Sequence, residues 1–185
     1  MANWRTRRGG GRAWRRPAGR RAQIVILGIA GLLAAYAYLK GRDSSLPAIL
    51  AGQATVIDGD SISIGGWRVR PEGIDAPEWE QTCAGANGTA WPCGKTAARE
   101  LGALIRGASL TCRPTGFDQY DRVLAECSLP DGTNVNAWLV RQGWAVAFGR
   151  SRLYASAEAE AKAAKHGVWV GTFERPSQWR ERQSE

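Results

Sequence analysis

Acidic and basic side chains that could carry out chemistry gather in the central part of the chain. Four carboxylates lie close to turn-forming glycines or prolines: Asp58, Asp60, Asp75 and Glu78. Without neighbouring His or Cys, such hard oxygen ligands suit Ca²⁺ or Mg²⁺ rather than Zn²⁺. Arg68, Arg70 and Arg122 are available to bond phosphate oxygens. In a site of this kind a metal polarises the phosphoryl oxygen, a carboxylate activates or orients water, and arginine neutralises the developing charge.

A purely structural interpretation of the same residues stays open at this point. Asp58-Gly59-Asp60 is a common hairpin turn, Asp75 to Glu78 is an ordinary loop sequence, and arginines on strands are usually solvated. The single histidine, His166, falls in the last turn of a predicted helix, where it favours the helix dipole. One histidine excludes a histidine-based nuclease or a Ser-His-Asp hydrolase.

The elements that must position these residues follow from hydrophobic periodicity and turn residues. β-Branched segments predict strands over residues 52–58, 61–66, 67–73, 109–114 and 122–129. Apolar spacing and glycine stops predict helices over 96–106, 134–142 and 152–166. This order predicts an α+β fold, a five-stranded OB-fold β-barrel with about three helices. In such a meander, Asp60 at one strand's start and Asp75 after another strand can meet.

Four ordered motifs resemble the thermonuclease family, whose domains are staphylococcal-nuclease-like. The segment VIDGDSISIGGWRVRPEGIDAPEWEQ resembles the family's opening, and DQYDRVLAEC, NVNAWLVRQGWA and GVWVGTFERPSQWR resemble later family segments, the last one in the bacterial exported branch. The resemblance extends over most of residues 51–182. It implies an OB fold, in agreement with the element order, and Ca²⁺-dependent hydrolysis of DNA and/or RNA.

The resemblance also implies roles for matching residues. Asp60 and Asp75 match calcium-binding carboxylates, and Ala76 stands where the family uses a backbone carbonyl, which any side chain preserves. Glu78 matches the general base or water-orienting carboxylate. Arg70 and Arg122 match the two arginines that hold the phosphate and stabilise its transition state.

The loop before Arg122 contains predicted substrate contacts and a departure from the family. Asp118 and Tyr120 fall on the substrate side of this loop, where Tyr120 could stack on a base. The family usually has glycine where this chain has Asp121, whose negative charge would weaken substrate attraction. Pro71, after Arg70, replaces an apolar residue and removes a ladder donor. Both changes are expected to reduce activity without abolishing the site.

The N-terminal part predicts a membrane anchor. Residues 1–21 form an Arg-rich tail expected to be disordered and cytoplasmic, and residues 22–39 contain no charge, which predicts a transmembrane signal-anchor helix. Residues 40–50 form a linker to the nuclease-like domain at 51–182. Because positive charge stays inside, we expect a single-pass inner-membrane protein with a periplasmic domain. The alternative is secretion after cleavage near Ala35-Tyr36-Ala37.

The charge balance places the whole positive excess in the tail. Eight of the 25 basic residues are arginines within residues 1–21, which contain no acid, so the remaining 17 basic residues balance the 17 acids. A basic-domain argument for nucleic-acid binding therefore fails. The expected partners are the DNA or RNA substrate and the membrane; no protein partner is evident, and we expect a monomer.

The four cysteines all lie in the predicted exported part. An even count there predicts two disulfides, and three pairings are possible. We favour Cys83–Cys93 and Cys112–Cys127, because each pair closes a short local loop. The rival interpretation is a four-Cys zinc site, which usually contains C-x-x-C pairs that this chain lacks.

Two other functions compete with the nuclease. The first is a non-catalytic OB-fold module that binds nucleic acid or a protein on the membrane. The second is an envelope scaffold whose Arg-rich tail holds anionic lipid or cytoplasmic nucleic acid. The nuclease is favoured over the first because Asp60, Arg70, Asp75, Glu78 and Arg122 are all retained.

Overall fold

The computed structural model describes residues 29, 31–32, 45–149 and 153–184, and Leu46–Glu185 form one compact unit. The predicted tail at 1–21 lies outside these residues, as do most of the predicted membrane segment at 22–39 and the linker as far as residue 44. Of the helices within the described ranges, none combines the length and apolar character needed to cross a bilayer.

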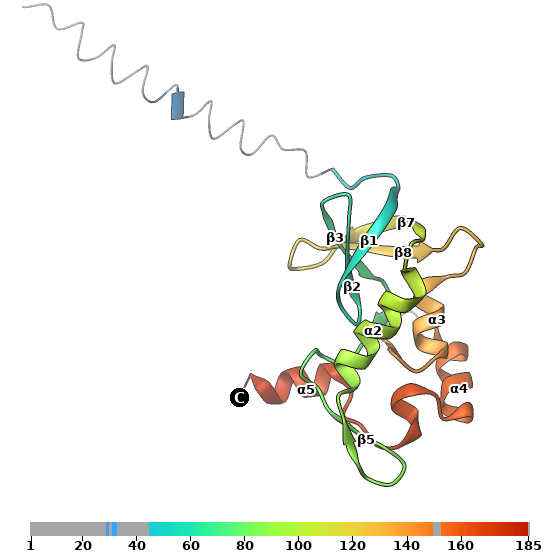
Figure 1. The fold of residues 1–185 in the computed structure, drawn as a ribbon. Helices are drawn as coiled ribbons and strands as arrows, with labels where there is room; N and C mark the ends of the chain where they lie inside the picture. Colours follow the sequence, from blue (N-terminus) through green and yellow to red (C-terminus); the bar gives the residue numbers. More distant parts are fainter. Residues whose placement is uncertain (1–28, 30, 33–44, 150–152, 185) are drawn as a thin grey trace, which may run out of the picture. The chain divides into compact units, whose positions relative to one another are not determined.

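Five strands close into a barrel in the order β1-β2-β3-β8-β7 (Figure 1). Their bounds are Leu50–Asp58 (β1), Ser61–Ile64 (β2), Trp67–Pro71 (β3), Ser109–Phe117 (β7) and Val123–Ser128 (β8). All neighbours pair antiparallel except β3 and β8, which run parallel and close the barrel. This arrangement confirms the predicted α+β fold with an OB-type barrel.

The barrel core follows the alternation of apolar residues along these strands. Ile62, Ile64, Val69, Val123 and Ala125 are each at most 1% exposed and point into one cluster. Strand β7 runs three residues further than predicted. A register shift between Pro114 and Gly116 lets it keep pairing with β8 as far as Phe117, which lies opposite Val123.

Helix α2 (Cys93–Ile105) packs against β1, and α3 (Val135–Arg141) packs against β8. Helix α2 begins three residues before its predicted start, directly after Pro92 at the cap. The buried Asn136 ties α3 to the barrel. Its side-chain amide donates to the carbonyls of Glu72 and Ala125, and its side-chain oxygen accepts the backbone N–H of Cys127.

Helix α4 (Ala155–Ala164) is shorter than the predicted 152–166, so His166 lies beyond it. The helix ends at Lys165, which adopts the left-handed conformation at the cap two residues before Gly167. Gly167 serves a close approach instead: a Cβ there would lie 2.3 Å from the carbonyl oxygen of Gly143. The 3₁₀ helix η1 (Gly167–Val170) follows. His166 is exposed, and its Nδ1 lies 3.2 Å from the carbonyl oxygen of Arg141, at the end of α3.

Three features were not predicted. Two-residue strands form the pairs β4 (Ile74–Asp75) with β9 (Val146–Ala147), and β5 (Cys83–Ala84) with β6 (Ala90–Trp91). A further helix, α5 (Pro176–Gln183), follows a segment anchored by Arg175, whose Nη2 donates to the carbonyl of Ala147 at 3.0 Å. The described residues therefore contain four α-helices rather than about three.

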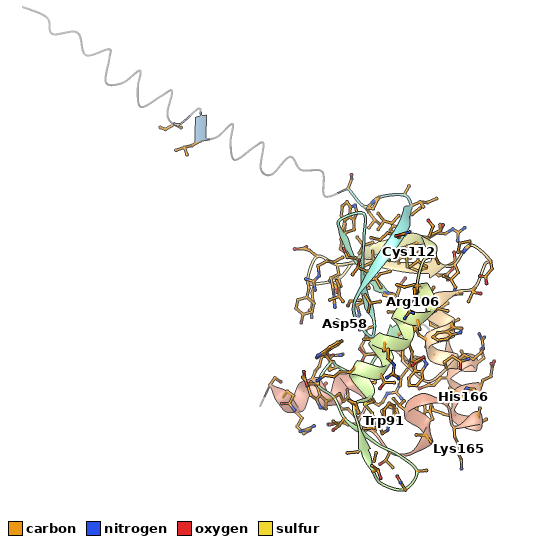
Figure 2. The ribbon with its side chains drawn as sticks, in the orientation of Figure 1. Asp58, Trp91, Arg106, Cys112, Lys165 and His166 are labelled. Atoms are coloured by element: carbon orange, nitrogen blue, oxygen red, sulfur yellow. A yellow bond between two sulfur atoms is a disulfide. The ribbon has the colours of Figure 1, made fainter. Side chains whose placement is uncertain are left out.

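The cysteines form the two predicted disulfides, Cys83–Cys93 and Cys112–Cys127, and none is free. The second bridge joins directly opposite residues of β7 and β8 (Figure 2). The first joins β5 to the first residue of α2 and lies in a small separate apolar cluster with Val168. Each bridge therefore closes a local connection, as the sequence spacing suggested.

Candidate active site

Two buried carboxylates form the base of the site. Asp60 lies in the turn after β1 and is 6% exposed, and Asp75 lies in β4 with none of its surface exposed. Two contacts hold Asp60. Its backbone N–H donates to Asp58 Oδ1 within the turn, and its Oδ2 accepts the backbone N–H of Ala76, after β4, at 2.9 Å. The Asp60 turn and the segment that contains Asp75 and Ala76 therefore lie side by side, as the sequence predicted, and the hydrogen bond from Ala76 to Asp60 joins them.

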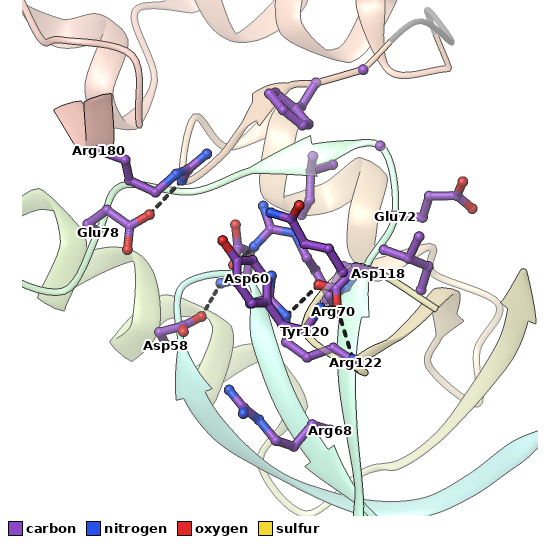
Figure 3. A pocket seen from close by; sticks show the side chains of 17 residues that line it. Asp58, Asp60, Arg68, Arg70, Glu72, Glu78, Asp118, Tyr120, Arg122 and Arg180 are labelled. Carbon is purple, nitrogen blue, oxygen red and sulfur yellow. Dashed lines mark hydrogen bonds and ion pairs between the residues drawn. The ribbon is translucent and has the colours of Figure 1, made fainter. Parts of the chain in front are cut away.

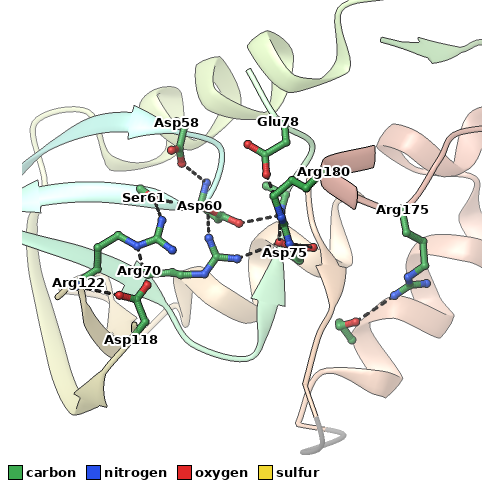
Figure 4. A network of polar contacts seen from close by, with 12 residues as sticks. Asp58, Asp60, Ser61, Arg70, Asp75, Glu78, Asp118, Arg122, Arg175 and Arg180 are labelled. Atoms are coloured by element: carbon green, nitrogen blue, oxygen red, sulfur yellow. Dashed lines mark hydrogen bonds and ion pairs between the residues drawn. The ribbon is translucent and has the colours of Figure 1, made fainter. Parts of the chain in front are cut away.

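Arg70, on β3, bridges these two acids (Figure 4). Its Nη1 lies 2.7 Å from Asp60 Oδ1, and its Nη2 lies 2.9 Å from Asp75 Oδ1. The parallel pairing of Arg70 with Leu124 fixes the strand position from which the guanidinium reaches both groups. Both carboxylates therefore face one point, where a positive charge is stabilised.

Burial makes Asp60 a weaker acid than an ordinary aspartate. Loss of hydration raises the pKa of Asp60 to about 7, although Arg70 and the N–H of Ala76 act to lower it. The negative charges of Asp58 and Asp75 raise it further. Asp60 is thus a carboxylate whose ionised form gains strongly from additional positive charge.

Glu78 is held at the edge of the site by its backbone. Its N–H donates to Gln81 Oε1 at 3.1 Å, and its carbonyl accepts the N–H of Gln81. Helix α2 supports this loop closely at Gly94, where a Cβ would lie 1.7 Å from the carbonyl oxygen of Glu78. Only glycine permits this contact, so the loop and the first turn of α2 are a single packed unit.

Asp118 organises the loop that carries Arg122. Its Oδ1 accepts the backbone N–H groups of Tyr120 and Arg122, and its Oδ2 accepts Arg122 Nε at 2.6 Å. These bonds lower the pKa of Asp118, against the opposing effect of its partial burial. They also aim Arg122 so that its Nη1 lies 3.4 Å from Ser61 Oγ. Asp118 thus fixes the guanidinium from behind.

Asp121, at the position where the family usually has glycine, has a φ of 58°. Asp tolerates this left-handed region at some cost. Tyr120, beside it, is 65% exposed, and the Arg122 guanidinium lies 5.5 Å from its ring centroid. An exposed ring beside a fixed arginine can stack on a flat ligand.

These groups border one cavity of about 890 Å³ (Figure 3). Its lining includes the predicted residues Asp60, Arg70, Glu78, Asp118, Tyr120 and Arg122. It also includes Asp58 and Arg68, which the sequence named as a candidate carboxylate and a candidate phosphate-binding arginine, and Phe148, which directly follows β9. Asp75 and Ala76 do not line it; both are buried behind it.

Sequence reasoning missed Arg180, which also lines the cavity. It extends from α5, pairs with Asp75 through both of its Nη atoms, at 3.0 and 3.1 Å, and donates to Glu78 Oε1. These pairs raise the pKa of Arg180 above its ordinary value, although partial burial acts to lower it. The available signal was the segment GVWVGTFERPSQWR, which ends at this residue.

The donor chemistry fits a hard divalent cation. Asp60 and Asp75 supply carboxylate oxygens at one guanidinium, and Ala76 follows directly, with its backbone N–H bonded to Asp60. Among the described residues, no group of three or more His, Cys, Asp or Glu has an arrangement able to hold a metal ion. A cation here would therefore rely on two carboxylates, a backbone carbonyl and water.

Known proteins with similar sequences identify the family of this chain. Residues 68–171 match the family model described as "Staphylococcal nuclease homologue". The chain is 40% identical over 136 residues to "Succinoglycan biosynthesis protein ExoI" of Rhizobium meliloti, covering 72% of this chain and 71% of that protein. It is 30% identical to an "Uncharacterized endonuclease" of Escherichia coli (62% and 72% covered). It is 28% identical to the "Probable staphylococcal-like nuclease CAN1" of Oryza sativa subsp. japonica (66% and 35% covered). The chain therefore belongs to the staphylococcal nuclease family.

Proposed function

We propose that this protein is a Ca²⁺-dependent nuclease that hydrolyses phosphodiester bonds of DNA and/or RNA. One observation carries the proposal: Arg70 and Arg122 border the same cavity as the carboxylates Asp60 and Glu78. Two guanidinium groups beside ionised acids form a site for a phosphate that must accept negative charge during attack.

The arginines would bind the scissile phosphate. Arg122 is held by Asp118 through its Nε, which leaves the outer nitrogens directed toward the cavity and Ser61. Both arginines are similarly shielded, with side chains 14% exposed for Arg70 and 16% for Arg122. With a phosphate between them, the two arginines would give up contacts to carboxylates and bond phosphate oxygens instead. Both would then stabilise the charge that develops on those oxygens.

Glu78 is the group placed to activate or orient the attacking water. Its side chain is 35% exposed and lines the cavity, whereas Asp75 is sealed from it. A carboxylate accepts a proton from water or holds it by a hydrogen bond, and water reaches only the exposed acid. The proton would pass from water to Glu78 Oε as the new phosphorus–oxygen bond forms and the bond from phosphorus to the leaving oxygen breaks, and the leaving oxygen would take a proton from solvent water.

Asp60, Asp75 and the carbonyl of Ala76 are the groups that would hold Ca²⁺. When bound, the cation would supply Lewis-acid polarisation of a phosphoryl oxygen. The oxygen-only donor set supports a hard cation, and burial raises the pKa of Asp60, so its ionised form would gain from a bound cation.

Tyr120 would bind the neighbouring base by stacking, because its ring is 65% exposed at the cavity rim. The domain itself is neutral in net charge, so binding would depend on local contacts rather than on a basic surface. We further propose that residues 22–39 anchor a monomeric protein in the inner membrane, with its nuclease domain in the periplasm, or direct its secretion.

The competing function is a non-catalytic OB-fold module, and the family name alone does not exclude it. The relative "Succinoglycan biosynthesis protein ExoI" is named for a biosynthetic process rather than for a nuclease. A module of this kind would bind nucleic acid or a protein without needing Glu78 and Arg122. Retention of both beside Arg70 in one cavity favours catalysis.

Hydrolysis by variant proteins tests the proposal. Purified protein is incubated with single-stranded DNA or RNA, with Ca²⁺ or with a chelator. We expect Glu78→Gln and Arg122→Ala to lower kcat/KM by at least about 100-fold, the scale of general-base and oxyanion-stabilising groups. Arg113→Ala is the matched control, because Arg113 is exposed on β7 and does not line the cavity. Unchanged, chelator-resistant hydrolysis in both site variants would refute the assignment.

A further inference from the structure

Arg180 contacts two acids with different proposed tasks. Its Nη1 donates to Asp75 Oδ1 at 3.0 Å and to Glu78 Oε1, and its Nη2 donates to Asp75 Oδ2 at 3.1 Å (Figure 4). Asp75 is a proposed metal ligand, and Glu78 is the proposed water-orienting group. One side chain from the C-terminal helix therefore connects the metal half of the site to the nucleophile half.

Asp75 has little capacity left for another cation. Its Oδ1 already accepts from both Arg70 and Arg180, and its Oδ2 accepts from Arg180. A carboxylate offers about four acceptor positions in all, so three are filled by guanidinium groups. A divalent ion at Asp75 would lie within a few ångströms of the Arg180 charge, at a position only 1% exposed, where repulsion is poorly screened.

The charge balance favours exchange of one cation for the other. Asp60, Asp75 and Glu78 together carry three negative charges when ionised, and Arg70 and Arg180 return two positive charges. Replacing Arg180 by Ca²⁺ brings the group to neutrality. Adding Ca²⁺ while Arg180 stays would leave an excess positive charge in a largely buried site, which is unfavourable.

The Arg180 side chain can move away from Asp75 while helix α5 stays in place. The start of α5 is fixed elsewhere: Gln81 Nε2 donates to the carbonyl of Glu174 at 2.7 Å, and Arg175 pairs with Glu158 and bonds the carbonyl of Ala147. The Arg180 side chain itself is 39% exposed. A rotation of this side chain toward solvent would free Asp75 while α5 remains anchored.

We propose that Arg180 is a further positioning residue of the active site: an internal cation that holds Asp75 and Glu78 before metal binds and lowers metal affinity by competing for Asp75. The inference rests on the proposed calcium-dependent function. In this inference Arg180 acts on the proposed metal ligand Asp75 and on the proposed water-orienting group Glu78, and not on the substrate. It also explains why a half-exposed arginine of a polar helix makes three contacts with the site's acids.

Calcium binding measures this competition directly. Calcium chloride is titrated calorimetrically into chelator-treated full-length protein, and thermal unfolding is recorded with and without calcium. We expect Arg180→Gln to bind Ca²⁺ about 5- to 10-fold more tightly than the wild type. Its metal-free Tm should fall, because Asp75 loses one of its two arginine partners, and saturating Ca²⁺ should restore the Tm to the wild-type value.

Two variants serve as controls for helix and charge. Arg182→Gln removes the same charge from α5, but Arg182 pairs with Glu174 and is 57% exposed, so calcium affinity should stay at the wild-type value. Arg180→Lys keeps the charge without the two-pronged geometry, so its affinity should lie between those of Arg180→Gln and the wild type. The calcium affinity of Arg180→Lys also tests the competition if Arg180→Gln does not fold.

The outcomes separate this inference from the proposed function. Equal or weaker calcium binding in Arg180→Gln and Arg180→Lys, in a protein whose wild type binds calcium, would overturn the competition alone. Absence of calcium binding in the wild type and in both variants would overturn the calcium assignment and this inference with it. Loss of binding in Asp75→Asn, with tightening in Arg180→Gln, is the pattern that supports both.

Discussion

Asp60 and Asp75 are buried acids, and their charges depend on arginines contributed by other elements. Arg70 serves both acids, while Asp60 has no contact with Arg180 among the described ion pairs. Burial is the largest influence on Asp60 and raises its pKa to about 7. In the unfolded chain the same carboxyl titrates near 3.8. Folding without a metal therefore favours the protonated form of this residue.

This difference predicts how the metal-free protein responds to pH. Between about pH 4 and 7 the folded state binds more protons at Asp60 than the unfolded state, so the free energy of unfolding should decrease as the pH rises. For one proton the slope reaches at most about 1.4 kcal/mol per pH unit. Denaturant unfolding in the presence of chelator measures it. The slope should diminish in Asp60→Asn, and an identical slope in the two proteins would contradict the raised pKa.

At the residue scale, sequence reasoning nominated most of the groups around the cavity but not Arg180. Asp60, Arg70 and Asp75 converge because a hairpin and a short connection join them, and such local geometry can be inferred from turns and alternation. Arg180 contacts Asp75 across 105 residues, and no local pattern encodes that distance. Asp121 has a positive φ, a backbone conformation that the family's usual glycine adopts without strain, so the departure noted in the sequence has a backbone cost as well as a charge.

At the element scale, helices and strands differed in how well the sequence predicted them. Strand β1 was recovered because exposed residues alternate with less exposed ones along it. The shorter strands β2 and β3 were recovered from β-branched residues bounded by glycine turns. Helix α5 buries only Pro176, so it has no apolar stripe to reveal it. Strands β4 and β9 contain two residues each, which is too short for any period. Tertiary contacts, including the Arg175 anchor, determine these short elements.

The contact between α2 and the Glu78 loop gives a prediction at this scale. Gly94→Ala would place a Cβ 1.7 Å from the carbonyl oxygen of Glu78, so the loop must shift. We expect a loss of about 2–3 kcal/mol in the free energy of unfolding and a marked fall in kcat. Gly102→Ala in the same helix is the control, because its nearest neighbour, Val56 Cγ2, is 3.7 Å away. Equal behaviour of the two variants would show that the loop is not held by this contact.

At the scale of the whole molecule, two disulfides reinforce a unit built from one barrel and peripheral helices. Cys112–Cys127 crosses two adjacent barrel strands, and Cys83–Cys93 joins the loop region to α2. The Cys83–Cys93 bridge lies near the site, because Cys93 Sγ is 3.4 Å from the carbonyl oxygen of Gln81, whose side chain accepts the backbone N–H of Glu78. An oxidising compartment, which the predicted export would provide, keeps both bridges formed.

Removal of the bridges should therefore separate stability from site geometry. Each bridge closes a short loop, with sequence separations of 10 and 15, and its loss should cost about 3 kcal/mol. The double variant Cys83→Ala/Cys93→Ala should lose stability and also activity at saturating substrate. Cys112→Ala/Cys127→Ala should lose stability but retain more of its kcat while folded. Denaturant melts and kinetics below the transition test this; greater loss of kcat in the second variant would contradict it.

The distance along the chain between Asp75 and Arg180 also affects the order in which the protein matures. Asp75 is synthesised 105 residues before the arginine that neutralises it, whereas the last barrel strand, β8, ends at Ser128. The barrel can therefore assemble while its acidic centre has only Arg70 as a counter-charge. During that interval the centre has its strongest electrostatic attraction for a free cation. The counter-charge of the proposed metal site is therefore complete only once the segment around Arg180 has been made.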